Sequence, residues 1–80
     1  MYTVYILYSD TFDSFYIGYS ANVQTRLKQH NDGLTKSTKA KIPWRLVYTE
    51  IFQTKAEAIK RERFLKDQKN KSFYKRLANL

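Results

Sequence analysis

The sequence contains 80 residues, and its 15 Lys and Arg against seven Asp and Glu give a formal net charge of +8. A chain of this length has room for one modest core, so we expect a single domain over residues 1–80. There is no cysteine and only one histidine. This composition excludes a disulfide framework, a thiolate metal site and a zinc site built on several imidazoles.

The positive charge is unevenly distributed along the chain. Residues 1–54 hold six basic and four acidic residues, net +2, whereas residues 55–80 hold nine and three, net +6. Such a cationic field attracts polyanions, so we expect nucleic acid as the partner, with a merely solubilising basic face as the alternative. No apolar run reaches membrane-spanning length and no signal peptide is evident, which favours a soluble, cytoplasmic protein.

The first part of the chain predicts a β-hairpin followed by a helix. Residues 1–9 carry apolar side chains on both sides, which is typical of an inner strand covered on both faces. After the polar turn SDTFDS, residues 15–20 return as the second strand. Asn22 is a good N-cap for a helix over 23–32, which ends at the sequence NDG.

The second part of the chain begins with the basic loop GLTKSTKAKIP and continues with a strand over 44–52. Thr54 and Glu57 form a capping box that opens a long helix over 55–68, and a short final helix follows over 72–79. The order ββαβαα predicts an α/β fold of the α+β type, a small three-stranded antiparallel sheet flanked by helices.

The hairpin contains two tyrosines beside a glycine. If residue 5 pairs with residue 18, then Tyr5, Tyr16 and Gly18 point to the same face of the sheet. A glycine weakens a strand unless backbone or ligand must approach closely there. We therefore expect a hole flanked by two phenols, open to a phosphate or a water, with aromatic packing around a glycine bulge as the alternative.

The first predicted helix carries Arg26 and His30 one turn apart, on either side of an apolar stripe. The two side chains can present a guanidinium and an imidazole to one point in space. Arg binds phosphate oxygens through a fork of donors, and His exchanges a proton near neutral pH. The alternative is an exposed arginine and a histidine satisfied by the carbonyls at the helix end.

The long predicted helix carries a carboxylate within its apolar stripe. Ala58, Ile59 and Leu65 define that stripe, and the spacing places Glu62 inside it. An ionised carboxylate on a core-facing surface is costly unless a cation or hydrogen-bond donors meet it. The spacing therefore predicts a functional cation beside Glu62, and the alternatives are a structural pair with Lys66 one turn on or with a core arginine.

In their order along the chain these motifs resemble the GIY-YIG nuclease domain. The sequence has TVY at 3–5, YIG at 16–18, NxxxRLxxHNxG at 22–33, PWxLVY at 43–48 and EAxxxExxxK at 57–66. The likeness extends over practically the whole chain and is greatest to small stand-alone bacterial members. One departure is Thr3, which replaces the glycine of the first motif.

The resemblance implies a metal-dependent endonuclease that hydrolyses phosphodiester bonds, with DNA favoured, in repair, recombination or structure-selective cleavage. Tyr5 would act as general base or position the water, and Tyr16 would hydrogen-bond near the scissile phosphate. Arg26 would stabilise the phosphoryl charge, and His30 would assist Tyr5 or the water. Glu62 would hold a single divalent metal, Mg²⁺ or Mn²⁺.

The residue types also suit this chemistry independently of the resemblance. Hydrolysis of a phosphodiester needs an in-line water and stabilisation of the charge on the phosphoryl and leaving oxygens. A lone carboxylate suits Mg²⁺, which keeps much of its hydration. A tyrosine with a pKa near 10 is a poor base, so we expect Arg26 and the metal to lower the pKa of Tyr5.

Further residues are expected to contact the nucleic-acid backbone. They are Gly18, Lys36, Lys39, Lys41 and Lys66, with the hydroxyls of Ser37 and Thr38 beside the loop lysines. The alternative for the loop is a solvated segment without a ligand. Trp44 is expected to cap the sheet core, with base stacking as the alternative if it is exposed.

Two other functions stay open from the sequence. One is a non-catalytic nucleic-acid-binding module of the same fold, whose salt-dependent affinity would be indifferent to Mg²⁺. The other is a protein-interaction module that uses the Trp44 and Phe73 surfaces to bind an acidic protein. Specificity is expected to be low or supplied by a protein partner. The sequence does not indicate whether the nucleic acid is DNA or RNA, and it does not indicate the oligomeric state.

Overall fold

The computed structural model describes residues 1–80. Three strands form an antiparallel sheet in the order β2-β1-β3, namely β1 (Tyr2–Ser9), β2 (Ser14–Ser20) and β3 (Arg45–Phe52). The helices are α1 (Val23–Asn31), α2 (Lys55–Gln68) and α3 (Lys71–Ala78), and a short 3₁₀ helix covers Lys39–Lys41. The predicted order ββαβαα and the α+β class are confirmed, whereas the 3₁₀ helix was predicted as loop.

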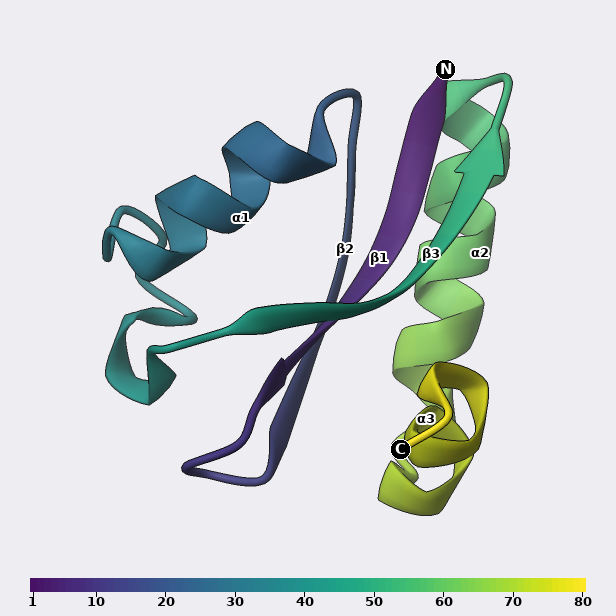
Figure 1. Ribbon diagram of the computed structural model, residues 1–80. Helices are drawn as coiled ribbons and strands as arrows, with labels where there is room; N and C mark the ends of the chain where they lie inside the picture. Colours follow the sequence, from purple (N-terminus) through teal and green to yellow (C-terminus); the bar gives the residue numbers. More distant parts are fainter.

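The sheet is covered on both faces. Figure 1 shows α1 on one side of the twisted sheet and α2 with α3 on the other. The core on the α2 side contains Val4, Ile6, Ile17, Ala58, Leu65 and Tyr74, and the smaller core on the α1 side contains Tyr5, Leu7 and Trp44. Successive side chains of a strand point to opposite faces, so β1 contributes to both cores, as predicted for an inner strand.

The pairing of the strands fixes which side chains share a face. Tyr5 pairs with Gly18 and Leu7 pairs with Tyr16 across β1 and β2, which confirms the expected register. On the other side of β1 the register with β3 shifts between Ile6 and Leu7. Ile6 pairs with Tyr48, whereas Leu7 pairs with Leu46. The unpaired Val47 forms a bulge, which bends β3 and increases its local twist.

The helices begin where local hydrogen-bonding groups predict. The side chain of Asn22 accepts a hydrogen bond from the backbone N–H of Thr25, 3.1 Å away, at the start of α1. Thr54 and Glu57 form the predicted capping box of α2. Asn70 caps α3, which begins at residue 71 rather than 72. These caps satisfy N–H groups that the first helical turn leaves without partners.

The segment between α1 and β3 folds back onto the sheet. Trp44 is 5% exposed and packs in the α1-side core, which confirms that it caps the core. Base stacking by Trp44 and a protein-binding surface built on it are therefore wrong, since the ring is not available to a partner. No helix of the chain combines the length and the apolar character needed to cross a membrane.

Candidate active site

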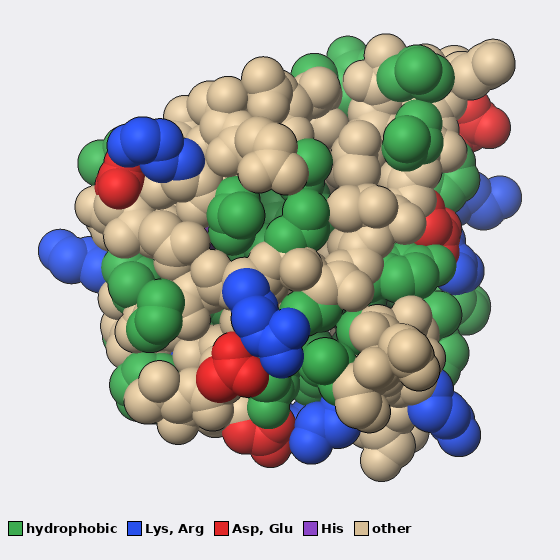
Figure 2. All heavy atoms as spheres, in the orientation of Figure 1, with side chains coloured by type: hydrophobic (Ala, Val, Ile, Leu, Met, Phe, Trp, Pro, Cys, Tyr) green, Lys and Arg blue, Asp and Glu red, His purple; other side chains and the backbone are tan.

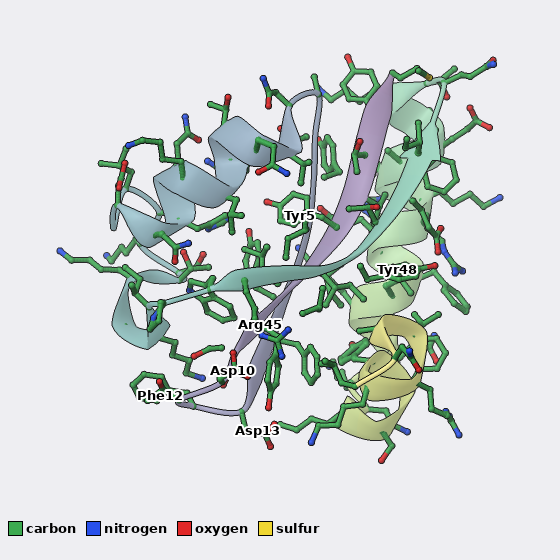
Figure 3. All side chains as sticks on the ribbon, viewed as in Figure 1. Tyr5, Asp10, Phe12, Asp13, Arg45 and Tyr48 are labelled. Atoms are coloured by element: carbon green, nitrogen blue, oxygen red, sulfur yellow. The ribbon has the colours of Figure 1, made fainter.

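Tyr5 lies at the centre of an aromatic cluster on the α1 side of the sheet. Its ring extends from β1 toward α1 (Figure 3), and the residue is 1% exposed. The phenol oxygen lies 3.0 Å from Nε2 of His30. The ring of Tyr16 lies close to both groups, with its centroid 4.8 Å from that of His30 and 6.4 Å from that of Tyr5. Two strands and α1 thus bring three proton-bearing side chains together.

Gly18 provides the space that Tyr5 occupies. A β-carbon at position 18 would lie 2.6 Å from Oη and 2.7 Å from Cζ of Tyr5, which is closer than carbon and oxygen atoms approach. The hole expected above Gly18 is therefore filled by the ring of Tyr5, and Gly18 itself is buried. This glycine allows the phenol to cross β2, and the space is not open to a phosphate.

His30 lies at the end of α1 and is fully buried, with 0% exposure. Its Nδ1 lies 2.8 Å from Oγ1 of Thr38, so both ring nitrogens have side-chain partners. Burial lowers the pKa of His30, and the positive charge of Arg26 lowers it further. Because the ordinary value is already near 6.5, the imidazole is neutral at pH 7. The expected alternative of an imidazole satisfied by carbonyls at the helix end is not observed.

Thr38 belongs to this cluster rather than to the loop surface. It is 1% exposed, and its hydroxyl contacts His30. The expectation that this hydroxyl contacts phosphate together with Ser37 is wrong, because the loop folds inward at this residue. Sequence analysis named Thr38 as a phosphate contact and missed its contact with His30. Its signal was its position in a basic loop, which did not distinguish an inward hydroxyl from an exposed one.

The protein groups around Tyr5 together raise its pKa, whereas a decrease was expected from Arg26 and a bound metal ion acting together. Burial raises its pKa to about 12, with a further increase from the neighbouring Tyr16 and a smaller one from the charge of Glu62. Arg26 acts in the expected direction and lowers the pKa, but burial outweighs it. Removing a charge from water is costly in a packed core, so Tyr5 is a neutral phenol at pH 7.

Arg26 stands beside the cluster, one turn before His30 on α1. Its positive charge acts on both Tyr5 and His30, which places the guanidinium near the pair. Nη1 donates a hydrogen bond to Oε1 of Gln29 at 2.9 Å. Gln29 therefore orients the guanidinium. Sequence analysis did not identify Gln29, although residues three apart on a helix, such as Arg26 and Gln29, lie next to each other.

Glu62 comes to the cluster from α2, on the other layer. Its side chain is 14% exposed, and Nζ of Lys66 lies 3.6 Å from Oε1. The same Lys66 nitrogen lies 6.0 Å from the centroid of the Tyr16 ring. The carboxylate is close enough to Tyr5 for its charge to raise the pKa of the phenol. Glu62 therefore lies near the cluster, and Lys66 is the cation that meets it.

The donor set around Glu62 limits the kind of metal that fits. No group of three or more His, Cys, Asp or Glu side chains forms a metal-binding cluster in the chain. This excludes a cage built from protein ligands alone. One partly exposed carboxylate is the donor that Mg²⁺ uses when it keeps most of its water ligands. Glu62 thus fits a hydrated ion bound through one carboxylate.

The three loop lysines, Lys36, Lys39 and Lys41, are exposed, and so is Lys66. Lys39 and Lys41 are the first and last residues of the 3₁₀ helix, which directly follows the buried Thr38.

Figure 2 shows no histidine on the face that it displays, in agreement with the burial of His30. A pocket on the surface lies outside the cluster of Tyr5, Tyr16 and His30. It is lined by Phe52, Glu57, Lys60, Arg61 and Phe64.

The chain is similar to several bacterial proteins. Residues 1–77 match the family described as the GIY-YIG catalytic domain. A UPF0213 protein of Bacillus licheniformis is 47% identical over 64 residues, which are 76% of this chain and 66% of that protein. One of Staphylococcus saprophyticus is 48% identical over 50 residues, 61% of each chain. The matches thus span less than two thirds of these relatives.

A solved structure is also similar. The solution NMR structure of a UPF0213 protein from Bacillus halodurans has a TM-score of 0.50 and 39% identity, covering 84% of this chain and 72% of that one. The family match covers the β-hairpin, α1 and α2, and therefore every residue of the cluster described above. The chain accordingly belongs to the GIY-YIG catalytic domain family.

Proposed function

We propose that this chain is an endonuclease domain that hydrolyses phosphodiester bonds in nucleic acid, with DNA as the favoured substrate and Mg²⁺ or Mn²⁺ as the metal. The observation that carries the proposal is the 3.0 Å contact between the phenol of Tyr5 and Nε2 of the neutral, buried His30. A phenol and a neutral imidazole in hydrogen-bond contact form a pair that can transfer a proton.

The proton of the attacking water moves through this pair. Tyr5 Oη takes a proton from the water as its own proton passes to Nε2 of His30. One O–H bond of the water breaks and an N–H bond forms on the imidazole, so the phenol ends neutral. The pKa of about 12 for Tyr5 makes a standing phenolate at pH 7 rare. His30 is therefore the net base, and Tyr5 carries the proton to it.

The remaining residues act on the phosphate. Arg26, held by Gln29, offers a guanidinium to the equatorial oxygens, where negative charge accumulates. Tyr16 borders the cluster and offers its hydroxyl to a non-bridging oxygen. Glu62 would hold the metal, which when bound supplies Lewis-acid stabilisation of the charge on the leaving oxygen. Lys66 would move from Glu62 toward the phosphate backbone, which is a polyanion.

The ion pair between Glu62 and Lys66 favours a second candidate function. A carboxylate that already has a cation 3.6 Å away does not require a metal. A nucleic-acid-binding module of the same fold, without cleavage, is consistent with that pair. Its affinity would fall with salt and would be independent of Mg²⁺.

Cleavage assays on labelled duplex, single-stranded and branched oligonucleotides, DNA and RNA, distinguish the two functions. Reactions contain Mn²⁺, Mg²⁺ or EDTA. We expect metal-dependent nicking by the wild type and a loss of at least about 100-fold in Glu62→Gln and Arg26→Ala, because each removes charge stabilisation. Asp67→Asn and Arg63→Ala are matched controls, since both residues are exposed on α2. Cleavage that persists in Glu62→Gln with EDTA contradicts the mechanism, and metal-independent binding without nicking supports the binding module.

A further inference from the structure

His30 is one link in a continuous chain of hydrogen bonds from β1 to the loop after α1. Oη of Tyr5 lies 3.0 Å from Nε2, and Nδ1 lies 2.8 Å from Oγ1 of Thr38. The Thr38 hydroxyl in turn donates to the carbonyl of Thr35 at 3.3 Å. Tyr5, His30 and Thr38 are each 1% exposed or less, so bulk water has little access to these contacts.

The two contacts of the Thr38 hydroxyl favour one position for each proton. A hydroxyl has one proton to donate, and a carbonyl oxygen can only accept. If Thr38 donated to His30, its oxygen would face the Thr35 carbonyl with no proton between them. Both contacts of Thr38 are hydrogen bonds only when its proton points to Thr35 and its lone pair faces Nδ1–H. The neutral ring then has a lone pair on Nε2, which accepts from Tyr5.

We infer that Thr38 is a positioning residue that holds the neutral His30 with its proton on Nδ1, leaving Nε2 free to accept the proton of Tyr5. In the opposite tautomer Nε2–H would donate to Tyr5, and the imidazole could not receive a proton at that nitrogen. The catalytic consequence rests on the proposed nuclease function. The tautomer itself does not, because it follows from the hydrogen bonds of the folded chain.

The backbone holds Thr38 in place from two directions. The indole Nε1–H of Trp44 donates to the carbonyl of Thr38 at 2.9 Å. The backbone N–H groups of Thr38 and Lys39 both donate to the carbonyl of Thr35, each at 3.1 Å. The threonine hydroxyl is therefore presented to His30 by a turn whose polar groups are satisfied. A hydrogen bond to one ring nitrogen determines which nitrogen of an imidazole carries the proton in other sites as well.

Nitrogen NMR of the imidazole tests the tautomer directly. The chain has a single histidine, so a long-range proton–nitrogen correlation spectrum at neutral pH contains the signals of one ring. We expect a protonated Nδ1 and an unprotonated Nε2 in the wild type and in Thr38→Ser, which keeps the hydroxyl. In Thr38→Val the valine has nearly the shape of threonine but no oxygen to accept a hydrogen bond from Nδ1–H. We therefore expect the proton to move to Nε2 in a substantial fraction of molecules. Backbone amide spectra check that each variant is folded.

Two NMR results would overturn the inference. One is a wild type with its proton on Nε2, and the other is a folded Thr38→Val with an unchanged tautomer. If Thr38→Val does not fold, the wild-type and Thr38→Ser spectra still decide where the proton lies. Because none of these measurements requires cleavage, an inactive wild type would refute the nuclease proposal and leave the tautomer assigned to His30 unchanged.

Single-turnover cleavage tests the consequence. We expect Thr38→Val to lower the rate by at least about 10-fold at saturating protein, with little change in the concentration that gives half-saturation, because proton transfer and not binding is impaired. Thr38→Ser should restore most of the rate. Thr11→Val, at an exposed turn residue, is the matched control and should cleave like the wild type. An active wild type with an unaffected Thr38→Val refutes the positioning role in catalysis.

Discussion

The side chain of Asn31 pairs with the backbone of Trp44 through two hydrogen bonds. Nδ2 donates to the Trp44 carbonyl at 2.9 Å, and the Trp44 N–H donates to Oδ1 at 2.7 Å. Asn31 is the last residue of α1, and Trp44 directly precedes β3. The amide therefore joins the two ends of the loop that carries Thr38, and it satisfies both backbone groups of Trp44.

Removing this amide should destabilise the fold. We expect Asn31→Ala to lower the free energy of unfolding by about 1–3 kcal/mol, because the Trp44 N–H and carbonyl lose their partners in a part-buried position. Asn31→Asp keeps an acceptor for the N–H but places an anionic oxygen against the carbonyl, so it should not restore stability. Urea denaturation measures both. Gln24→Ala, at an exposed site on α1, should stay within about 0.5 kcal/mol of the wild type, and an equally small effect at Asn31 would contradict the prediction.

Gly18 and Tyr5 should be energetically coupled. A β-carbon at Gly18 would lie 2.6 Å from the phenol oxygen, so Gly18→Ala should cost about 1–3 kcal/mol by displacing the ring. In a Tyr5→Leu background the conflicting atoms are absent, and we expect the cost of Gly18→Ala to fall by at least about 0.5 kcal/mol. Chemical denaturation of the four proteins gives this coupling. Gly33→Ala is the control: it is strained by the φ of +77° at that position, and its cost should be the same in both backgrounds. A cost of Gly18→Ala that is also the same in both backgrounds would refute the coupling.

His30 should make the fold sensitive to mild acid. Burial lowers its folded pKa below the ordinary value of about 6.5, so the unfolded chain binds the proton more tightly. This contribution to stability is fully present above pH 6.5 and is lost as the pH falls through that value toward the folded pKa. The lowered pKa values of Asp10, Asp13 and Glu50 act in the same direction, but only below about pH 4.

Urea midpoints between pH 7.5 and 4.5 measure this loss, with His30→Gln as the comparison. We expect the wild type to lose stability across this range and the variant to lose markedly less, whatever its absolute stability. Parallel profiles for the two proteins would show that His30 does not cause the acid sensitivity. Cleavage should also fall over the same range, because a protonated imidazole cannot accept the proton of Tyr5.

The exposed loop lysines should set the salt dependence of nucleic-acid binding. Changing Lys36, Lys39 and Lys41 together to Gln should reduce the slope of log affinity against log salt by about 2–3, since each phosphate contact contributes about 0.9 on duplex DNA. A control with Lys55, Lys60 and Lys71 changed to Gln removes the same charge elsewhere. Fluorescence anisotropy at several salt concentrations measures both, and equal slopes would mean that net charge alone directs binding.

The sequence determined the elements and the register of the hairpin. Asn22 and the pair of Thr54 and Glu57 placed the starts of α1 and α2, because a cap acts on N–H groups within three residues of itself. Gly18 opposite Tyr5 followed from the alternation of the two strands. Such interactions are local, so the order of residues is enough to predict them.

The tertiary structure decided the protonation of the site. The pKa of Tyr5 rises rather than falls, and Thr38 turns inward to His30 rather than outward to solvent. Glu62 pairs with Lys66, which is one of the partners that the sequence left open for this carboxylate. Each outcome depends on how completely other elements remove a side chain from water. Desolvation is a property of the packed layers, and no spacing along the chain measures it.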